Sequence, residues 1–201
     1  MRKLLVALFG VVALTLCGCS SKSTDAVAAS EPTGTVATFL KGGAMDVATA
    51  TSKLKAGGFE VVATVPNVVE EGTVIVFTCP KLKAEGAKPG RGYIAAMRLF
   101  VDEKEKSIAI TNPVYFGKAY MQDQYNHNTF AAIKGKIDAA FPGLKDSADN
   151  MKFKNLEDFH FTIGMPYYKD QALLGEGTND ELIARAKTFK KGADIIFELK
   201  I

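Results

Sequence analysis

The chain has 201 residues, of which 25 are basic and 22 acidic, so its formal net charge is only +3. No run of lysine and arginine is interleaved with aromatic residues, which argues against a nucleic-acid-binding protein. Three cysteines are also too few for the disulfide framework of a small secreted domain.

The N-terminus has the layout of a secretory signal. Arg2 and Lys3 precede an uncharged apolar run over residues 4–16, which is shorter than the roughly 20 apolar residues that a membrane-spanning helix needs. The run ends in LCGC (residues 16–19), which resembles the bacterial lipobox. In proteins of that class the signal is cut before the final cysteine, so the resemblance implies diacylglycerol, with acyl chains such as palmitate, on Cys19.

Two other interpretations of the cysteine pair are weaker. A metal site would need further ligands, and residues 20–40 contain neither histidine nor another cysteine. A disulfide between Cys17 and Cys19 would be strained, because the two residues are only two positions apart.

These features predict three regions. Residues 1–18 are expected to be the signal peptide, residues 19–44 the lipidated cysteine with a flexible tether, and residues 45–201 a single α+β domain. Cleavage would leave 183 residues (201 less 18), which is enough for one domain with its own core. The tether is inferred from SSKSTDAVAASEPTG, which holds almost no bulky apolar residues. Ser20 stands where aspartate often marks retention in the inner membrane, so the resemblance favours the outer membrane, on its periplasmic or surface side.

Helix and strand patterns alternate beyond the tether. Helical spacing of apolar residues predicts three helices, and runs rich in β-branched residues or with alternating apolar positions predict five strands. The expected helices are 45–56, one capped by Asn128 and one capped by Asn179; the expected strands are 59–65, 73–78, 93–102, 107–111 and 194–201. Residues 81–92 are expected to form a loop, and residues 144–177 to be irregular. The prediction is an α+β fold with a mostly antiparallel sheet of about four to five strands and helices packed on one side.

Part of this pattern resembles a known family. The motifs GGFEVVATV, VFTCPKL, AAMRLFVDE and ITNP occur in an order and spacing similar to the family called domain of unknown function 302. The similarity spans about residues 45–115, and implies a small α+β fold without an established activity. One departure is Cys79, at a position where the family more often has asparagine.

Arg98 is the most informative charge. Ala95, Met97, Leu99 and Val101 alternate along one face of its expected strand, which leaves Arg98 on the other face among apolar neighbours. Such an arginine either pairs with a carboxylate across the sheet or binds an anionic ligand, because its planar guanidinium suits carboxylates and phosphates.

The loop beside this strand completes the predicted site. Lys81, Lys88 and Arg91 lie among glycines and prolines between two apolar strands, and we expect them, with Cys79 and Arg98, to form one rim of a binding pocket. Cys79 itself is expected to pack as a small hydrophobic residue, because its strand is almost wholly apolar.

No catalytic motif of the common hydrolases, zinc enzymes, nucleotide-binding proteins or CxxC oxidoreductases occurs. His127 is expected to be a solvated loop residue, and His160 to lie half-buried in a short helix rather than on a metal. Neither a metal nor a cofactor is therefore expected.

The expected function is a non-catalytic, lipid-anchored envelope protein that binds a small ligand or a partner protein. The alternatives are a thiol-based enzyme or redox protein centred on Cys79, and a structural module that self-associates, for example as a homodimer, through exposed sheet edges.

Overall fold

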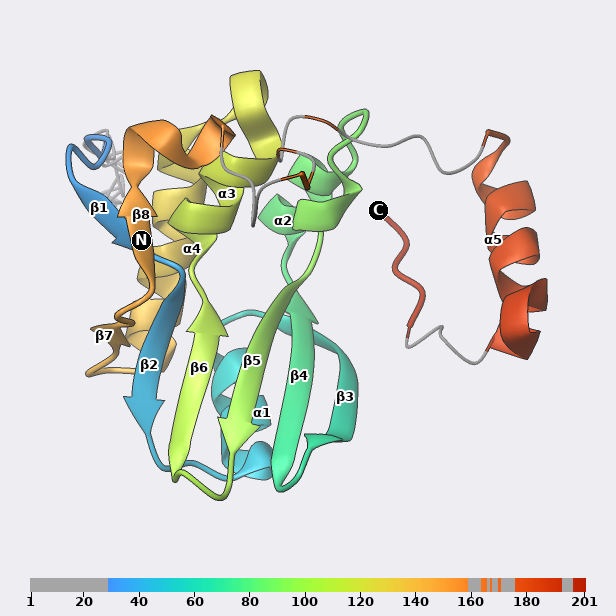
Figure 1. Cartoon of the computed structure of the whole chain (residues 1–201). Coiled ribbons are helices and arrows are strands. Elements are labelled where there is room, and N and C mark those ends of the chain that lie inside the picture. The colour runs from blue at the N-terminus through green and yellow to red at the C-terminus, as the bar shows by residue number, and fades with distance from the viewer. Residues whose placement is uncertain (1–28, 159–163, 166, 168–169, 171–175, 193–196) are drawn as a thin grey trace, which may run out of the picture.

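The computed structural model describes residues 29–158, 164–165, 167, 170, 176–192 and 197–201. At its centre is a six-stranded antiparallel sheet with the strand order β3-β4-β5-β6-β2-β7 (Figure 1). Its strands are β2 (Phe39–Gly43), β3 (Glu60–Val69), β4 (Gly72–Thr78), β5 (Met97–Asp102), β6 (Ser107–Thr111) and β7 (Lys145–Asp146). A two-stranded antiparallel sheet pairs β1 (Thr35–Ala37) with β8 (Asn150–Lys152). The predicted α+β class is confirmed, and the main sheet is larger than expected.

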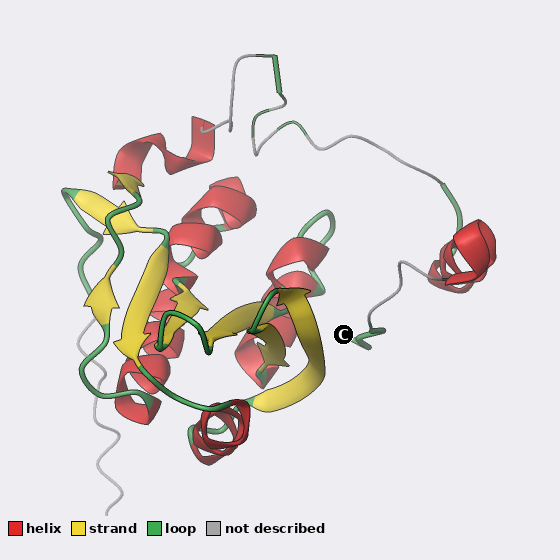
Figure 2. Cartoon of the chain, turned by 60° about the horizontal axis from the view of Figure 1, so that its bottom comes forward, coloured by secondary structure: helices red, strands yellow, loops and turns green. Residues whose placement is uncertain are grey.

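Five α-helices accompany the sheets in the described part of the chain. They are α1 (Val47–Ala56), α2 (Pro80–Gly86), α3 (Pro113–Met121), α4 (His127–Ala140) and α5 (Asn179–Thr188), with short 3₁₀ turns η1 (Gly92–Ile94), η2 (Gln122–Gln124), η3 (Phe153–Asp158) and η4 (Phe189–Gly192). Helices α2 and α3 both begin with proline, whose fixed φ suits the first helical turn and whose missing N–H is not needed there. Helix α5 has no buried residue and stands apart from the sheet (Figure 2).

The core lies on one face of the main sheet. Alternate residues of the central strands, such as Ile75, Leu99 and Ile110, are completely buried there. Helices α1 and α4 pack over this face with Leu54 and Ile133, and they lie behind the sheet in Figure 1. Burying one such side chain contributes roughly 1.5–3 kcal/mol, so these layers hold the fold together. The opposite face of the sheet, which we call the open face, is only partly covered by the described residues.

The folded region begins earlier than the sequence predicted. Strand β1 begins at Thr35 and β2 at Phe39, both inside the range 19–44 that was expected to be a tether. Leu40 is 1% exposed, and β2 is paired on both sides, with β6 and with β7. The expectation was wrong for residues 35–43, because a five-residue strand that ends in two glycines has too little pattern to be separated from a linker.

Other differences concern helix ends and short elements. The loop expected at 81–92 contains α2, and α3 was not predicted. Asn126, not Asn128, caps α4 by accepting a hydrogen bond from the Thr129 N–H, and Thr178, not Asn179, caps α5. Residues 144–177 are less irregular than expected, since β7, β8 and η3 lie in them.

The C-terminal strand expected at 194–201 is not found in its described part. Residues 197–201 form no strand, and residues 193–196 lie outside the described part of the chain. The strands at 59–65, 73–78 and 107–111 and the hairpin joining β5 to β6 are confirmed.

Candidate functional site on the open face of the sheet

The open face of the sheet forms the floor of a cavity. Register pairs Val74 with Phe100 and Val76 with Arg98, so these residues share the face opposite the buried Leu99. With Phe116 of α3 and Asp149, the open-face residues line a cavity of about 450 Å³ that is open to solvent. The sheet contributes Phe39, Lys41, Val74, Arg98, Phe100, Ala109 and Thr111. The cavity is therefore mostly apolar, with Arg98, Lys41 and Asp149 as its charged groups.

Arg98 is held in place through its backbone. The hydroxyl of Thr111 accepts a hydrogen bond from the Arg98 N–H at 3.0 Å and donates one to the Arg98 carbonyl at 3.1 Å. Thr111 is only 8% exposed, so this clamp is protected from water. The regular pairing of β5 with β6 runs from the hairpin turn to Leu99 and does not include Arg98. The Thr111 hydroxyl therefore fixes the backbone at the point from which the Arg98 side chain projects.

The guanidinium of Arg98 makes no ion pair or hydrogen bond with the residues that the structure describes. The carboxylate partner that the sequence suggested is thus not found within that part of the chain. The side chain is exposed on the open face. Of the two interpretations of Arg98, anion binding gains support from this arrangement.

A row of aromatic rings borders the same face. The rings of Phe39 and Phe116 lie 6.4 Å apart, those of Phe116 and Tyr120 5.6 Å apart, and those of Tyr120 and Tyr93 6.0 Å apart. We call these four residues the aromatic wall. A small cavity of about 30 Å³ lies between the wall and Arg98. Burial raises the pKa of Tyr120, and the positive charge of Arg98 acts in the opposite direction. The phenol is therefore protonated at neutral pH and able to donate a hydrogen bond.

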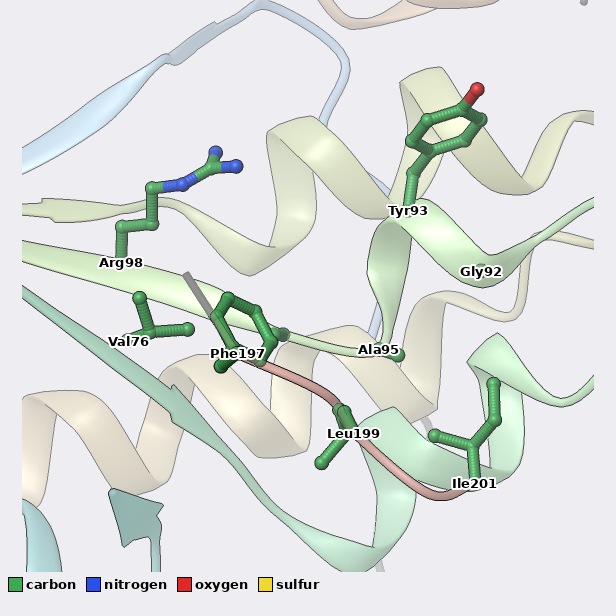
Figure 3. A pocket seen from close by; sticks show the side chains of 9 residues that line it. Val76, Gly92, Tyr93, Ala95, Arg98, Phe197, Leu199 and Ile201 are labelled. Carbon is green, nitrogen blue, oxygen red and sulfur yellow. The ribbon is translucent and has the colours of Figure 1, made fainter. Parts of the chain in front are cut away.

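A third cavity, of about 260 Å³, adjoins the small one and shares Tyr93, Ala96 and Arg98 with it (Figure 3). Val76 of β4 and Arg98 of β5 line it from the sheet, together with Gly92 and Tyr93 of η1 and with Ala95 and Ala96, which join η1 to β5. Phe197, Leu199 and Ile201 line it from the C-terminal segment, with Phe197 at the end toward Arg98. Arg98 thus takes part in all three cavities.

The cations predicted to join Arg98 lie elsewhere. Lys88 is ion-paired with Glu85, and Arg91, whose side chain is 15% exposed, is paired with Asp123 at 3.1 Å. Lys81 is exposed on α2. None of these three cations lines the three cavities, although the end of their loop does so through Gly92 and Tyr93. Of the five residues predicted to form the rim, only Arg98 lines these cavities. The prediction was wrong for the three cations and for Cys79.

Cys79 is buried in the core. It is 2% exposed, it precedes Pro80 at the start of α2, and its side chain makes no capping hydrogen bond. It belongs to the cluster formed by the sheet and the helices that cover it. This placement agrees with the expectation of a packed thiol.

The two histidines do not form a metal centre in the described structure. His127 is the first residue of α4 rather than a loop residue, and its Nδ1 lies 2.8 Å from the hydroxyl of Tyr125. His160 lies outside the described residues. Within the described chain no three His, Cys, Asp or Glu residues are grouped so that they could hold a metal ion, and no helix is long and apolar enough to cross a membrane.

Sequence reasoning missed the aromatic wall. Phe39 lies in the range expected to be a tether, and Phe116 and Tyr120 lie in α3, which was not predicted. The available signal was Asn112-Pro113, because asparagine as N-cap followed by proline at the first position is a helix start. From that start, Phe116 and Tyr120 are four positions apart and share one helical face.

Comparison of the chain with protein-family models, with curated proteins and with solved structures found no match. The resemblance to the family called domain of unknown function 302 therefore stays a prediction, and the arguments about function rest on the site itself.

Proposed function

We propose that the protein is a non-catalytic binding protein of the bacterial envelope, anchored through lipid on Cys19, and that its ligand site is the open face of the sheet around Arg98. The observation that carries the site is the Arg98 guanidinium, which has no ion-pair partner among the described residues and stands on an apolar floor beside the aromatic wall. Pockets of this kind, apolar with a few fixed polar groups, are typical of ligand sites. The chemistry fits a ligand with an apolar body and one anionic group.

The two alternative classes gain less support. A thiolate catalyst must be accessible and near a cation or histidine, whereas Cys79 is 2% exposed within the core. Self-association through sheet edges is hindered at β3, because Pro66 and the positive φ of Asn67 interrupt its pairing. The opposite edge strand, β7, is only two residues long.

Two dyes with the same aromatic body test the site. Anilinonaphthalene sulfonate carries an anionic group, and N-phenyl-naphthylamine lacks it. We expect fluorescence titration to show that the native chain binds the sulfonate more tightly than the neutral dye. Arg98→Gln should weaken sulfonate binding about tenfold. This is the lower end of the contribution of a charge-assisted hydrogen bond, which applies here because Arg98 is exposed. Binding of the neutral dye should change little.

Lys104→Gln is the matched control. Lys104 lies in the turn between β5 and β6, its side chain is 61% exposed, and it lines none of the three cavities. Its removal should leave both dyes unaffected. Equal loss of sulfonate binding in the two variants would mean that net charge, rather than a site at Arg98, attracts the dye, and the proposal would then fail.

The anchor is tested separately. Lipid chains contribute roughly 0.8 kcal/mol per buried methylene, so a diacylglycerol would hold the chain firmly on a membrane. Cys19→Ala should leave the protein unprocessed or released into the soluble fraction, whereas Cys17→Ala should change neither. An intact mass showing an unmodified cysteine at the start of the processed chain would contradict lipidation.

A further inference from the structure

The C-terminal segment 197–201 has two different sides. Phe197, Leu199 and Ile201 all line the 260 Å³ cavity beside Arg98 (Figure 3). Glu198, between the first two, is paired instead with Lys187 of α5 at 2.6 Å. Alternate residues of an extended segment point in opposite directions. The segment therefore presents its apolar side to the sheet and its charged side to α5.

We infer that the open face binds an extended peptide segment with apolar side chains at alternate positions, and that residues 197–201 are a resident occupant which such a ligand displaces. The inference rests on the proposed function and names its ligand class. The chain itself supplies an example of the ligand, placed against Val76, Ala95 and Ala96.

The resident segment is held loosely. Phe197 remains 36% exposed and Ile201 55% exposed, and residues 197–201 form no strand with the sheet. The side chains of Lys187 and Glu198 are about half exposed, so their ion pair is screened by solvent and adds little. A competing peptide can therefore displace the segment without breaking up the core.

The site also extends beyond the resident segment. On the other side of Arg98 the 450 Å³ cavity continues over Val74, Phe100 and Ala109 toward Phe39, and no residue of 197–201 lines it. A longer peptide would place further side chains there. Arg98 would then lie beneath the middle of the peptide, where its guanidinium can bind a carbonyl or carboxylate oxygen.

The test adds peptides to the full-length chain. The first peptide is acetylated FELKI, the sequence of residues 197–201, and the second replaces its three apolar residues with serine and keeps its charges. Both carry a fluorophore for anisotropy. The protein is used in its native form and as the triple variant Phe197→Ser/Leu199→Ser/Ile201→Ser, in which the resident segment has lost its apolar side.

We expect FELKI to bind the triple variant about tenfold more tightly than the native chain, which corresponds to a segment that covers the face nine-tenths of the time. The serine peptide should bind neither form. The matched control is Leu182→Ser/Ile183→Ser/Phe189→Ser, three apolar residues of α5 and η4 that line none of the three cavities, and it should behave as the native chain.

Each result separates the inference from the proposed function. If FELKI binds the native chain and the triple variant equally, or fails to bind the variant although the sulfonate dye still binds in an Arg98-dependent manner, the inference is overturned and the proposed function stands. If neither the dye nor the peptide binds, both are overturned. Tighter peptide binding by the triple variant alone supports both.

Discussion

Gly117 lies in the middle of α3, where the absence of a side chain lets this helix approach α4. A Cβ atom at this position would lie 2.5–2.8 Å from three atoms of the Phe130 ring, which is fully buried. Gly135, in α4, offers a matched position, because a Cβ there would have nothing within 4 Å. The same substitution to alanine should therefore stabilise the protein at Gly135 but not at Gly117.

The expected magnitudes follow from these distances. Alanine stabilises a helix relative to glycine by about 1 kcal/mol, and this gain is common to both variants. At Gly117 the new methyl group must displace the Phe130 ring, and overpacking of this kind costs about 1–3 kcal/mol. Gly135→Ala should thus raise the free energy of unfolding by about 1 kcal/mol, while Gly117→Ala lowers it or leaves it unchanged.

Urea denaturation followed by far-UV circular dichroism measures both free energies. The difference between the variants removes the shared helix contribution and should be about 1–3 kcal/mol, the cost of overpacking alone. In a Phe130→Leu background Gly117→Ala should cost less than it does in the native chain, because the smaller side chain leaves room for the methyl group. If Gly117→Ala proves as stable as Gly135→Ala, the contact between α3 and α4 is not rigid and the reasoning is refuted.

Two further predictions concern single groups. In a chain where Cys79 is the only thiol, a thiol reagent at neutral pH should label Cys79 far more slowly in the folded protein than in urea. The reason is that Cys79 is buried, so labelling requires the core to open. Rapid stoichiometric labelling of the folded chain would contradict this. Asp46, the N-cap of α1, accepts hydrogen bonds from the N–H and hydroxyl of Thr49, and these hold its pKa below the ordinary value of 3.8. A lowered pKa means that the stability from the carboxylate is present above that ordinary value and is lost as the pH falls through the folded-state pKa. The stability advantage of the native chain over Asp46→Asn, measured by urea denaturation, should therefore shrink as the pH falls from about 5 to about 2, and a constant difference would contradict the assignment.

The parts of the fold that could be predicted are those with a strong local pattern. The alternation of Met97, Leu99 and Val101 around Arg98 gave the strand, its buried face and the exposed position of the arginine. Strand β2 was missed for a different reason. Its burial depends on partners far along the chain, such as Ile110 opposite Leu40, and no local pattern reveals those partners. Helix α3 did have a local signal in Asn112-Pro113, which the prediction did not use.

The same distinction applies to the candidate site. Arg98 was found because a charge on an apolar strand stands out in the sequence. Lys88 and Arg91 were grouped with it by composition, but Glu85 and Asp123 hold them in ion pairs. Ion pairing between distant positions is set by the three-dimensional arrangement, and the sequence could not indicate which of these cations would have no carboxylate partner in the described part of the chain.

The position of β2 bears on the order in which the chain folds. Strands β3 and β4 form one hairpin and strands β5 and β6 another, with α2 and η1 between the two hairpins. These four strands pair with neighbours that are close in sequence, so they can pair while the chain is still being completed. Leu40 in β2, by contrast, faces Ile110 on one side and Asp146 on the other, roughly 70 and 100 positions further along. Strand β2 can therefore pair on both sides only after β6 and β7 have formed, and we expect this pairing to be a late, slow step of folding. Residues near the proposed lipid anchor would then join the sheet last.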